Sequence, residues 1–162
     1  MPHSIRDEEY QALAELRFRI RQFLRGSDES ARAAGLEPQQ YQMLLAIRSL
    51  NGGEEATIRR LADRLFLRHH SAVELIDRLE AHGYIRRSRS REDRRRVLVT
   101  LLPRGERALE QVARQRLDEL RASGFALIQA LEAILKQARM KRSGMNLPVV
   151  RSRKEKRPIT SR

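Results

Sequence analysis

The chain has 162 residues, of which 40% are hydrophobic and 34% charged, so it is long enough for one substantial core and too polar for a membrane protein. It contains no cysteine, which excludes a disulfide framework and a thiolate nucleophile. The longest apolar segment, 124–135, is too short to span a bilayer, and the N-terminus lacks the apolar run of a secretory signal. We therefore expect a cytoplasmic protein that has no membrane partner.

The net charge of +13 is concentrated in two segments. Residues 86–96 contain seven arginines against two acidic residues, and residues 139–162 contain nine lysines and arginines against one glutamate. The rest of the chain is neutral. Clustered positive charge favours a polyanionic partner, because each neutralised phosphate releases condensed counterions. A single basic run is equally consistent with a solvated surface, but two separate runs favour nucleic acid.

Hydrophobic periodicity predicts a first helix over about 8–25, with Gly26, Ser27 and Gly35 loosening the segment that follows. A second helix begins at Pro38, because proline is tolerated in the first helical turn, and it ends at the glycines 52–53. Its predicted buried residues are Tyr41, Leu44, Leu45 and Ile47.

A short third helix follows Thr57, which is a good N-cap residue, and a fourth covers about 69–82. Gly83 ends the fourth helix, as glycine often does just beyond a helix C-terminus. Two extended segments, 84–89 and 95–101, then flank a short polar tip and predict a β-hairpin, with Val97 and Val99 facing the core. Pro103 opens a long helix to about residue 122, Gly124 interrupts it, and a last helix covers 125–138.

This order predicts a mainly α fold with a small β-wing, namely a winged helix-turn-helix with N- and C-terminal dimerisation helices. In helix-turn-helix proteins the N-terminal residues of the second helix contact base edges in the major groove of DNA. The expected major-groove residues are Arg68, His69, His70, Ser71, Val73, Glu74, Asp77 and Arg78. Each of them is also consistent with an ordinary solvated helix face. Asp77 and Glu74 are acidic, and either of them is equally suited to orienting a neighbouring arginine.

The basic half of the hairpin explains why arginines stand directly beside an apolar strand. The strand anchors the hairpin in the core, and the planar, always-charged guanidinium groups bind phosphates or enter a narrow minor groove. The expected wing contacts are Arg86, Arg87, Arg89, Arg91, Asp93, Arg94, Arg95 and Arg96.

The segment 57–105 resembles the MarR family of bacterial transcription regulators at residue level. It contains Ser71, then LIDRLEAHGYIRR at 75–87 and DRRRVLVTLLPRG at 93–105, which follow the family's recognition helix and wing. In helix order the likeness extends over about 8–138. Asp93 and Arg95 fall on the family's D-x-R motif, which implies that the arginine enters the minor groove and that the aspartate holds it in place.

The chain also departs from the family pattern. Leu102 stands where the family commonly has a capping threonine, so we expect a less well capped helix start there. Arg96 replaces a small polar residue and adds charge at the base of the wing. We divide the chain into one domain, 1–139, and a basic flexible tail, 140–162, that is not a family feature. The domain has dimerisation helices at about 8–25 and 104–138, and a winged helix-turn-helix at about 38–102.

The resemblance implies a homodimer that binds a near-palindromic site on double-stranded DNA as a ligand-responsive repressor. The wide apolar stripes at 8–25 and 106–138 agree with a dimer independently, because one chain of this size has difficulty covering them. An aromatic or phenolic effector is expected in the crevice between the dimerisation helices and the winged domain. Arg17, Tyr41 and Arg48 are candidates for facing that crevice, although each of them also fits an ordinary structural role.

Two other classes of function were weighed against this one. An enzyme lacks support: His69 and His70 diverge by about 100° on a helix and cannot chelate one metal together, and no phosphate-binding loop is present, so no metal and no cofactor are expected. The alternative is a charge-driven architectural protein that binds nucleic acid regardless of sequence. The basic tail suits that alternative or an RNA-binding protein. Against RNA recognition, the chain has only seven aromatic residues, and most of them lie at helix-core positions rather than on a base-stacking platform.

Overall fold

The computed structural model describes residues 4–51 and 55–143. In this part of the chain there are six helices and one two-stranded antiparallel sheet. The helices are α1 (Asp7–Ala33), α2 (Pro38–Leu50), α3 (Ile58–Arg64), α4 (His69–Ala81), α5 (Pro103–Ser123) and α6 (Phe125–Ser143), and the strands are β1 (Ile85–Arg89) and β2 (Val97–Leu101). The predicted mainly α fold with a β-wing is confirmed.

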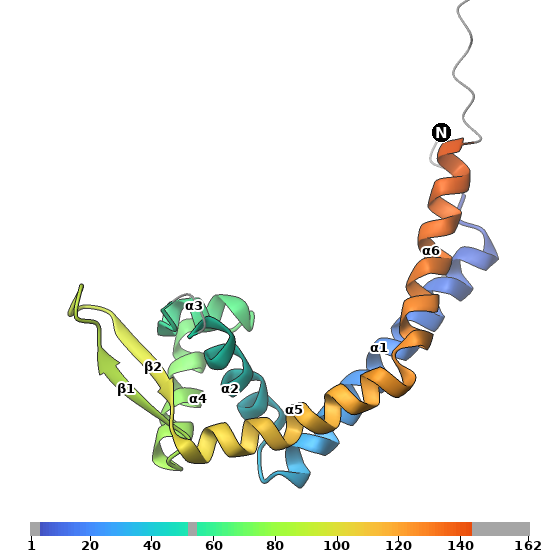
Figure 1. Ribbon diagram of the computed structural model, residues 1–162. Coiled ribbons are helices and arrows are strands. Elements are labelled where there is room, and N and C mark those ends of the chain that lie inside the picture. The colour runs from blue at the N-terminus through green and yellow to red at the C-terminus, as the bar shows by residue number, and fades with distance from the viewer. Residues whose placement is uncertain (1–3, 52–54, 144–162) are drawn as a thin grey trace, which may run out of the picture.

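The elements form a head and a long arm, which Figure 1 shows. Helices α2, α3 and α4 pack together in the head, and the β1–β2 hairpin projects from one side of it. Helix α5 starts at the root of the hairpin, contacts α2, and leads away into the arm, where α1 lies along α5 and α6. The arm therefore joins the first and the last helices of the chain.

The hydrophobic core lies in the head rather than in the arm. Its fully buried side chains come mainly from α2, α3, α4 and the hairpin, with Val112 added by α5. They are Leu36, Met43, Leu44, Ile47, Leu61, Ile76, Leu79, Ile85, Val99 and Val112. The predicted anchoring of the hairpin is confirmed for Val99, which is completely buried, while Val97 is half-buried.

Several predicted helix boundaries are confirmed by the local hydrogen bonds. The Thr57 hydroxyl accepts a hydrogen bond from the backbone N–H of Arg60 at 3.3 Å and caps α3. Gly83 has φ +71°, the left-handed conformation that suits glycine after a helix C-terminus. Leu102 precedes α5 without any side-chain hydrogen bond, so this helix start is indeed poorly capped.

The predicted end of the first helix near residue 25 is wrong, since α1 continues through Gly26 to Ala33. Gly26 is a packing residue: a Cβ atom there would stand 2.6 Å from Nη1 of Arg116, which lies buried beneath it. The Ser30 hydroxyl donates to the Gly26 carbonyl at 2.9 Å and supports the helix across this position. A glycine that appears to break a helix here allows α5 to approach α1.

Two further predictions are corrected. Helix α6 runs to Ser143, so residues 140–143 of the predicted tail belong to a helix, and the domain boundary at 139 falls inside it; residues 144–162 lie outside the described part. Leu45 was predicted to be buried, but its side chain is 44% exposed. It lies on the side of α2 that faces away from the core residues Met43, Leu44 and Ile47.

The root of the hairpin is closed by a contact that only glycine permits. The backbone N–H of Leu102 donates to the carbonyl oxygen of Tyr84 at 2.9 Å, and Gly105 in the first turn of α5 lies against that same oxygen. A Cβ atom at residue 105 would stand well inside van der Waals contact of this carbonyl group, which belongs to the rigid backbone.

Gly105→Ala should therefore destabilise the fold by about 1–3 kcal/mol, the usual cost of overpacking a rigid site. Thermal unfolding followed by circular dichroism measures the effect, with the exposed α5 change Gln111→Ala as control. An unchanged melting temperature for Gly105→Ala would show that the hairpin root is not packed in this way.

Candidate nucleic-acid interface

Helix α4 is held by one face and presents the other to solvent. Ala72, Leu75, Ile76 and Leu79 are buried in the core of the head. Of the residues predicted to read the major groove, most are exposed and two are half-buried. The exposed ones are Arg68, His69, His70, Glu74, Asp77 and Arg78, and the half-buried ones are Ser71 and Val73. The helix thus offers a polar face, beginning at its N-terminal turn.

The hairpin is tied to the head through its backbone. The N–H of Val99 donates to the carbonyl oxygen of Ala56 at 2.9 Å, and Thr57 forms an isolated bridge with Leu98. The Asn51 side-chain amide donates to the carbonyl oxygen of Val99 at 3.4 Å. The segment before α3 therefore borders β2 like a short third strand, which fixes the base of the wing.

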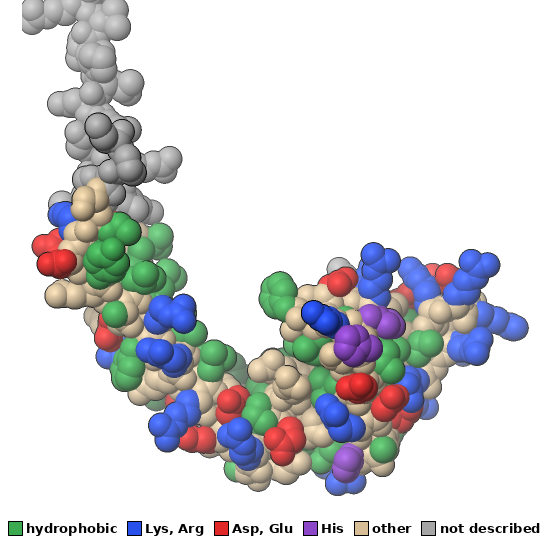
Figure 2. Space-filling model, turned by 180° about the vertical axis from the view of Figure 1, so that it is seen from behind, with side chains coloured by type: hydrophobic (Ala, Val, Ile, Leu, Met, Phe, Trp, Pro, Cys, Tyr) green, Lys and Arg blue, Asp and Glu red, His purple; other side chains and the backbone are tan. Residues whose placement is uncertain are grey.

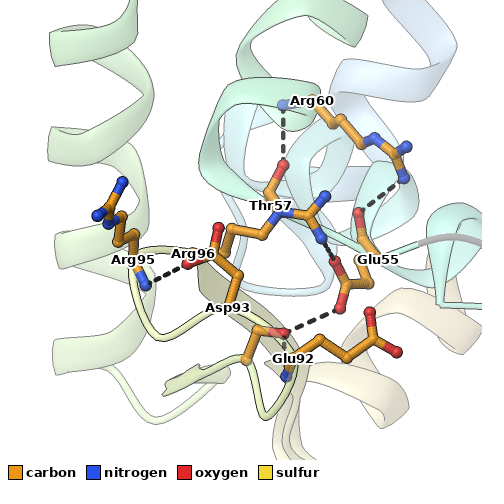
Figure 3. A network of polar contacts seen from close by, with 8 residues as sticks. Glu55, Thr57, Arg60, Glu92, Asp93, Arg95 and Arg96 are labelled. Carbon is orange, nitrogen blue, oxygen red and sulfur yellow. Dashed lines mark hydrogen bonds and ion pairs between the residues drawn. The ribbon is translucent and has the colours of Figure 1, made fainter.

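The carboxylate of Glu55 holds the tip end of the hairpin to the head, as Figure 3 shows. It accepts hydrogen bonds from Nη1 of Arg96 at 2.6 Å and from the hydroxyl of Ser90 at 3.2 Å. Ser90 is almost completely buried, and its hydroxyl also accepts from the backbone N–H of Glu92. The arginine expected to add charge at the base of the wing is thus paired with an acidic residue.

Asp93 organises the turn at the wing tip through backbone atoms (Figure 3). Its carboxylate accepts from the backbone N–H of Arg95 at 3.0 Å, and its carbonyl oxygen accepts from the N–H of Arg96 at 2.9 Å. The expected aspartate–arginine contact is present, but it holds the main chain of Arg95, and among the described residues no ion pair involves the guanidinium group.

Arg87 is bound to α4 by two carboxylates. Its guanidinium group lies 2.6 Å from Asp77 and 2.6 Å from Glu80, and its backbone N–H donates to Glu80 at 2.7 Å. The pKa of Glu80 lies below its ordinary value, first because of that backbone hydrogen bond and then because of the guanidinium group. The hydrogen bond that the Arg87 side chain donates to Glu80 contributes most to raising the pKa of Arg87. This arginine joins β1 to α4, and Asp77 helps to orient its guanidinium group.

The wing arginines therefore divide into two groups. Arg87 and Arg96 form the ion pairs just described, and Arg86 donates to the Thr100 hydroxyl at 3.3 Å. Within the described part of the chain no ion pair is formed by the remaining four, all of them exposed: Arg89, Arg91, Arg94 and Arg95. Figure 2 shows Lys and Arg side chains gathered at the hairpin end of the head. The cationic end of the hairpin and the exposed N-terminal turn of α4 therefore lie at the same end of the head.

Comparison with known proteins agrees with this geometry. A profile of the MarR family matches residues 34–96, the segment from the end of α1 to the wing. YsmB of Bacillus subtilis (strain 168), an uncharacterized HTH-type transcriptional regulator, is 31% identical over 87 residues. That match covers 54% of this chain and 60% of YsmB, less than two thirds of the relative's length. The likeness to the MarR family is therefore carried by residues 34–96, the segment that holds the winged helix-turn-helix.

Solved MarR-type structures share the fold at low sequence identity. AbsC, a MarR family transcriptional regulator from Streptomyces coelicolor, is 20% identical with a TM-score of 0.66, covering 88% of this chain and 99% of AbsC. A MepR mutant from S. aureus, solved bound to an oligodeoxyribonucleotide, is 18% identical with a TM-score of 0.58, covering 83% of this chain and 94% of MepR.

A cleft of about 330 Å³ separates the wing from α3 and α4. Among its lining residues are Arg59, Arg60, His69, Arg95 and Arg96. Glu55, Arg59 and Arg60 also belong to this region and were not among the residues predicted for it. The adjacent arginines of α3 carried a signal, because α3 belongs to the helix-turn-helix, whereas nothing in the sequence pairs Glu55 with Arg96.

The three residues expected at an effector crevice are not brought together. Tyr41 is buried, and burial raises the pKa of its hydroxyl, an effect that the nearby charge of Arg116 opposes. Arg17 is exposed on α1. Arg48 lines a cleft of about 310 Å³ between α2, β2 and α5, where it lies 3.3 Å from Glu106.

Two other features of the described residues bear on the class of protein. None of their helices is long and apolar enough to cross a membrane. No group of three or more His, Asp or Glu side chains among them is arranged to hold a metal ion.

Proposed function

We propose that this chain is a homodimeric transcription regulator that binds specific sites on duplex DNA. The observation that carries the proposal is the fixed wing. Four exposed arginines, which form no ion pair with any described residue, stand beside the exposed N-terminal turn of α4. A surface of this kind fits two successive features of a duplex, with α4 in the major groove and the wing at the neighbouring backbone and minor groove. The DNA-bound MepR mutant, which shares the fold, supports this partner.

The contacts proposed for DNA are assigned to the exposed residues of α4 and to those wing arginines that form no ion pair with a described residue. Arg95 reads the minor groove, because its main chain is held while its guanidinium group forms no ion pair within the described part of the chain. Arg89, Arg91 and Arg94 contact phosphate groups, and the residues 68–74 of α4 face base edges. Arg87 and Arg96 act indirectly, by setting the position of the wing.

The proposed homodimer rests on the uncovered apolar surface of the arm. Twelve large hydrophobic side chains at the start of the chain and on α1, α5 and α6 are between 37% and 67% exposed, and Figure 2 shows hydrophobic side chains gathered along the arm. They are Ile5, Tyr10, Leu13, Phe18, Ile20, Leu24, Leu117, Leu120, Phe125, Ile128, Leu131 and Leu135. A second copy covering this face would pair two heads, so the DNA site is a near-palindrome. A dimer bound across a promoter blocks transcription, which makes repression the proposed mode of action.

Arg95→Ala should weaken binding to a DNA site selected by the protein from a random duplex pool by about tenfold or more, because one groove-reading contact is lost. The dimer should stay folded. Fluorescence anisotropy measures the affinity, and analytical ultracentrifugation checks the dimer. Arg121→Ala, which removes the same charge from the far end of α5, is the matched control. Equal affinities for Arg95→Ala and the unaltered protein would remove the wing from the mechanism.

The cleft between α2, β2 and α5 is the proposed place for a small aromatic or phenolic effector. Leu45, Leu101 and Leu109 supply apolar walls, and the Arg48–Glu106 pair supplies polar groups at its edge. The cleft touches both the wing strand β2 and the arm helix α5. A ligand there shifts the equilibrium only if it prefers one relative position of head and arm.

Leu45→Trp should fill this cleft and abolish release of DNA by phenol or benzoate, while leaving DNA affinity in their absence unchanged. Titration of a preformed protein–DNA complex with each compound measures the release. Gln42→Trp, an exposed change on the same helix, should respond as the unaltered protein does. Release from the Leu45→Trp variant at the unaltered concentration would exclude this cleft.

A further inference from the structure

Phe66 is the most exposed large hydrophobic side chain of the described residues, at 97%. It stands in the turn between α3 and α4, two residues before the N-cap residue of α4, Arg68. Its neighbours Leu65 and Leu67 both pack against the core, so the turn is anchored on each side while the phenyl ring points outward. Its exposure therefore results from an ordered backbone position.

Phe66 also has an unusual backbone conformation for a residue with a large side chain. Its φ of +53° is left-handed, and Phe66 is the one residue other than glycine with a positive φ in the described part of the chain. The N–H of Phe66 donates to Asp63 at 3.2 Å and the N–H of Leu67 donates to Ala62 at 2.9 Å, which is the hydrogen-bonded helix end that glycine normally occupies. A large side chain is disfavoured there by sterics and by solvation, so folding does not account for it.

The proposed dimer face does not account for Phe66 either. The other exposed hydrophobic side chains lie at the start of the chain and on α1, α5 and α6, apart from Leu45 at the α2 cleft. Phe66 belongs to the head, two residues before the N-cap of the helix that carries His69 and His70. Its position is therefore at the edge of the proposed DNA surface, next to the residues that face base edges.

We propose that Phe66 is a specificity-determining residue that contacts the 5-methyl group of a thymine in the major groove. The thymine methyl is the apolar group that base edges present in that groove, and a phenyl ring is one of the side chains that contacts it. Arg64 and Arg68, which flank Phe66 in the sequence, are both exposed and supply positive charge in this turn, which suits a nucleic-acid partner. This inference rests on the proposed function, since it needs α4 to lie in the major groove.

The test measures how the unaltered protein and two Phe66 variants bind two forms of one DNA site, which differ only in the thymine methyl groups. The site is selected from a random duplex pool by the full-length protein, then synthesised once with thymine and once with deoxyuridine at every thymine position, which deletes only the methyl groups. Phe66→Gly and Phe66→Asn are the variants, because both residues accept a left-handed backbone. The affinity of each protein for each form of the site and the melting temperature of each protein are measured. A duplex of the same length with a shuffled sequence is the reference DNA.

Phe66→Gly should melt about 2–4 °C higher than the unaltered protein because the backbone strain is relieved. It should nevertheless bind the thymine site about tenfold more weakly, counting one methyl contact in each half-site. On the deoxyuridine site the variant and the unaltered protein should bind equally, and Phe66→Asn should behave in the same way.

Two outcomes would overturn the inference while leaving the proposed function intact: an affinity for the thymine site that Phe66→Gly does not change, or the same loss on both forms of the site. Failure of the proposed function gives a different result, because the unaltered protein would then bind the selected and shuffled duplexes equally. That result would overturn both proposals.

Discussion

The hairpin is held in place by two carboxylates of the head, and the DNA-binding account depends on those contacts. Glu80 of α4 binds Arg87 near the root of the wing, and Glu55 binds Arg96 and Ser90 near its tip. An isolated two-stranded hairpin is marginally stable in water, so a wing of this length needs such anchors to keep one orientation. With the anchors in place, the arginines at the tip occupy a defined position relative to α4.

Because of these ion pairs, the wing presents less free positive charge to DNA than its sequence indicates. The seven arginines of 86–96 are not seven equivalent phosphate ligands, because Arg87 and Arg96 are neutralised locally by Asp77, Glu80 and Glu55. The charges that remain are concentrated toward the tip, around a turn whose main chain is fixed by Asp93. Positive charge at a fixed place can distinguish DNA shapes, whereas the same charge on a mobile chain contributes only affinity that depends on salt.

The fold was largely predictable from the sequence because its signals are local. The apolar periodicity of α2, α3 and α4, the cap at Thr57 and the left-handed Gly83 each depend on a few neighbouring residues. The errors came from contacts between distant segments. Gly26 continues a helix because Arg116 of α5 lies against it, and Leu45 is exposed because the core takes the other side of α2.

The candidate site was predictable as a set of residues but not as a set of roles. Composition and order placed arginines on the wing, yet nothing local indicates that Arg96 binds Glu55, which is far away in the sequence, or that Asp93 contacts a main-chain rather than a guanidinium N–H. Phe66 shows a similar limit: its sequence neighbours predict a brief turn, but only the backbone conformation shows how exposed the ring is.

The measurement that tests the fixed wing most directly is DNA affinity of the Glu55→Gln variant at constant salt, on the specific site and on a shuffled duplex. The change raises the net charge from +13 to +14, so binding driven by charge alone should tighten on both duplexes. Glu132→Gln on α6 makes the same change of charge far from the wing and serves as the control. A fixed wing predicts weaker binding of Glu55→Gln to the specific site and no such loss for Glu132→Gln. Tighter binding of Glu55→Gln to both duplexes would contradict it and favour a protein that binds DNA regardless of sequence.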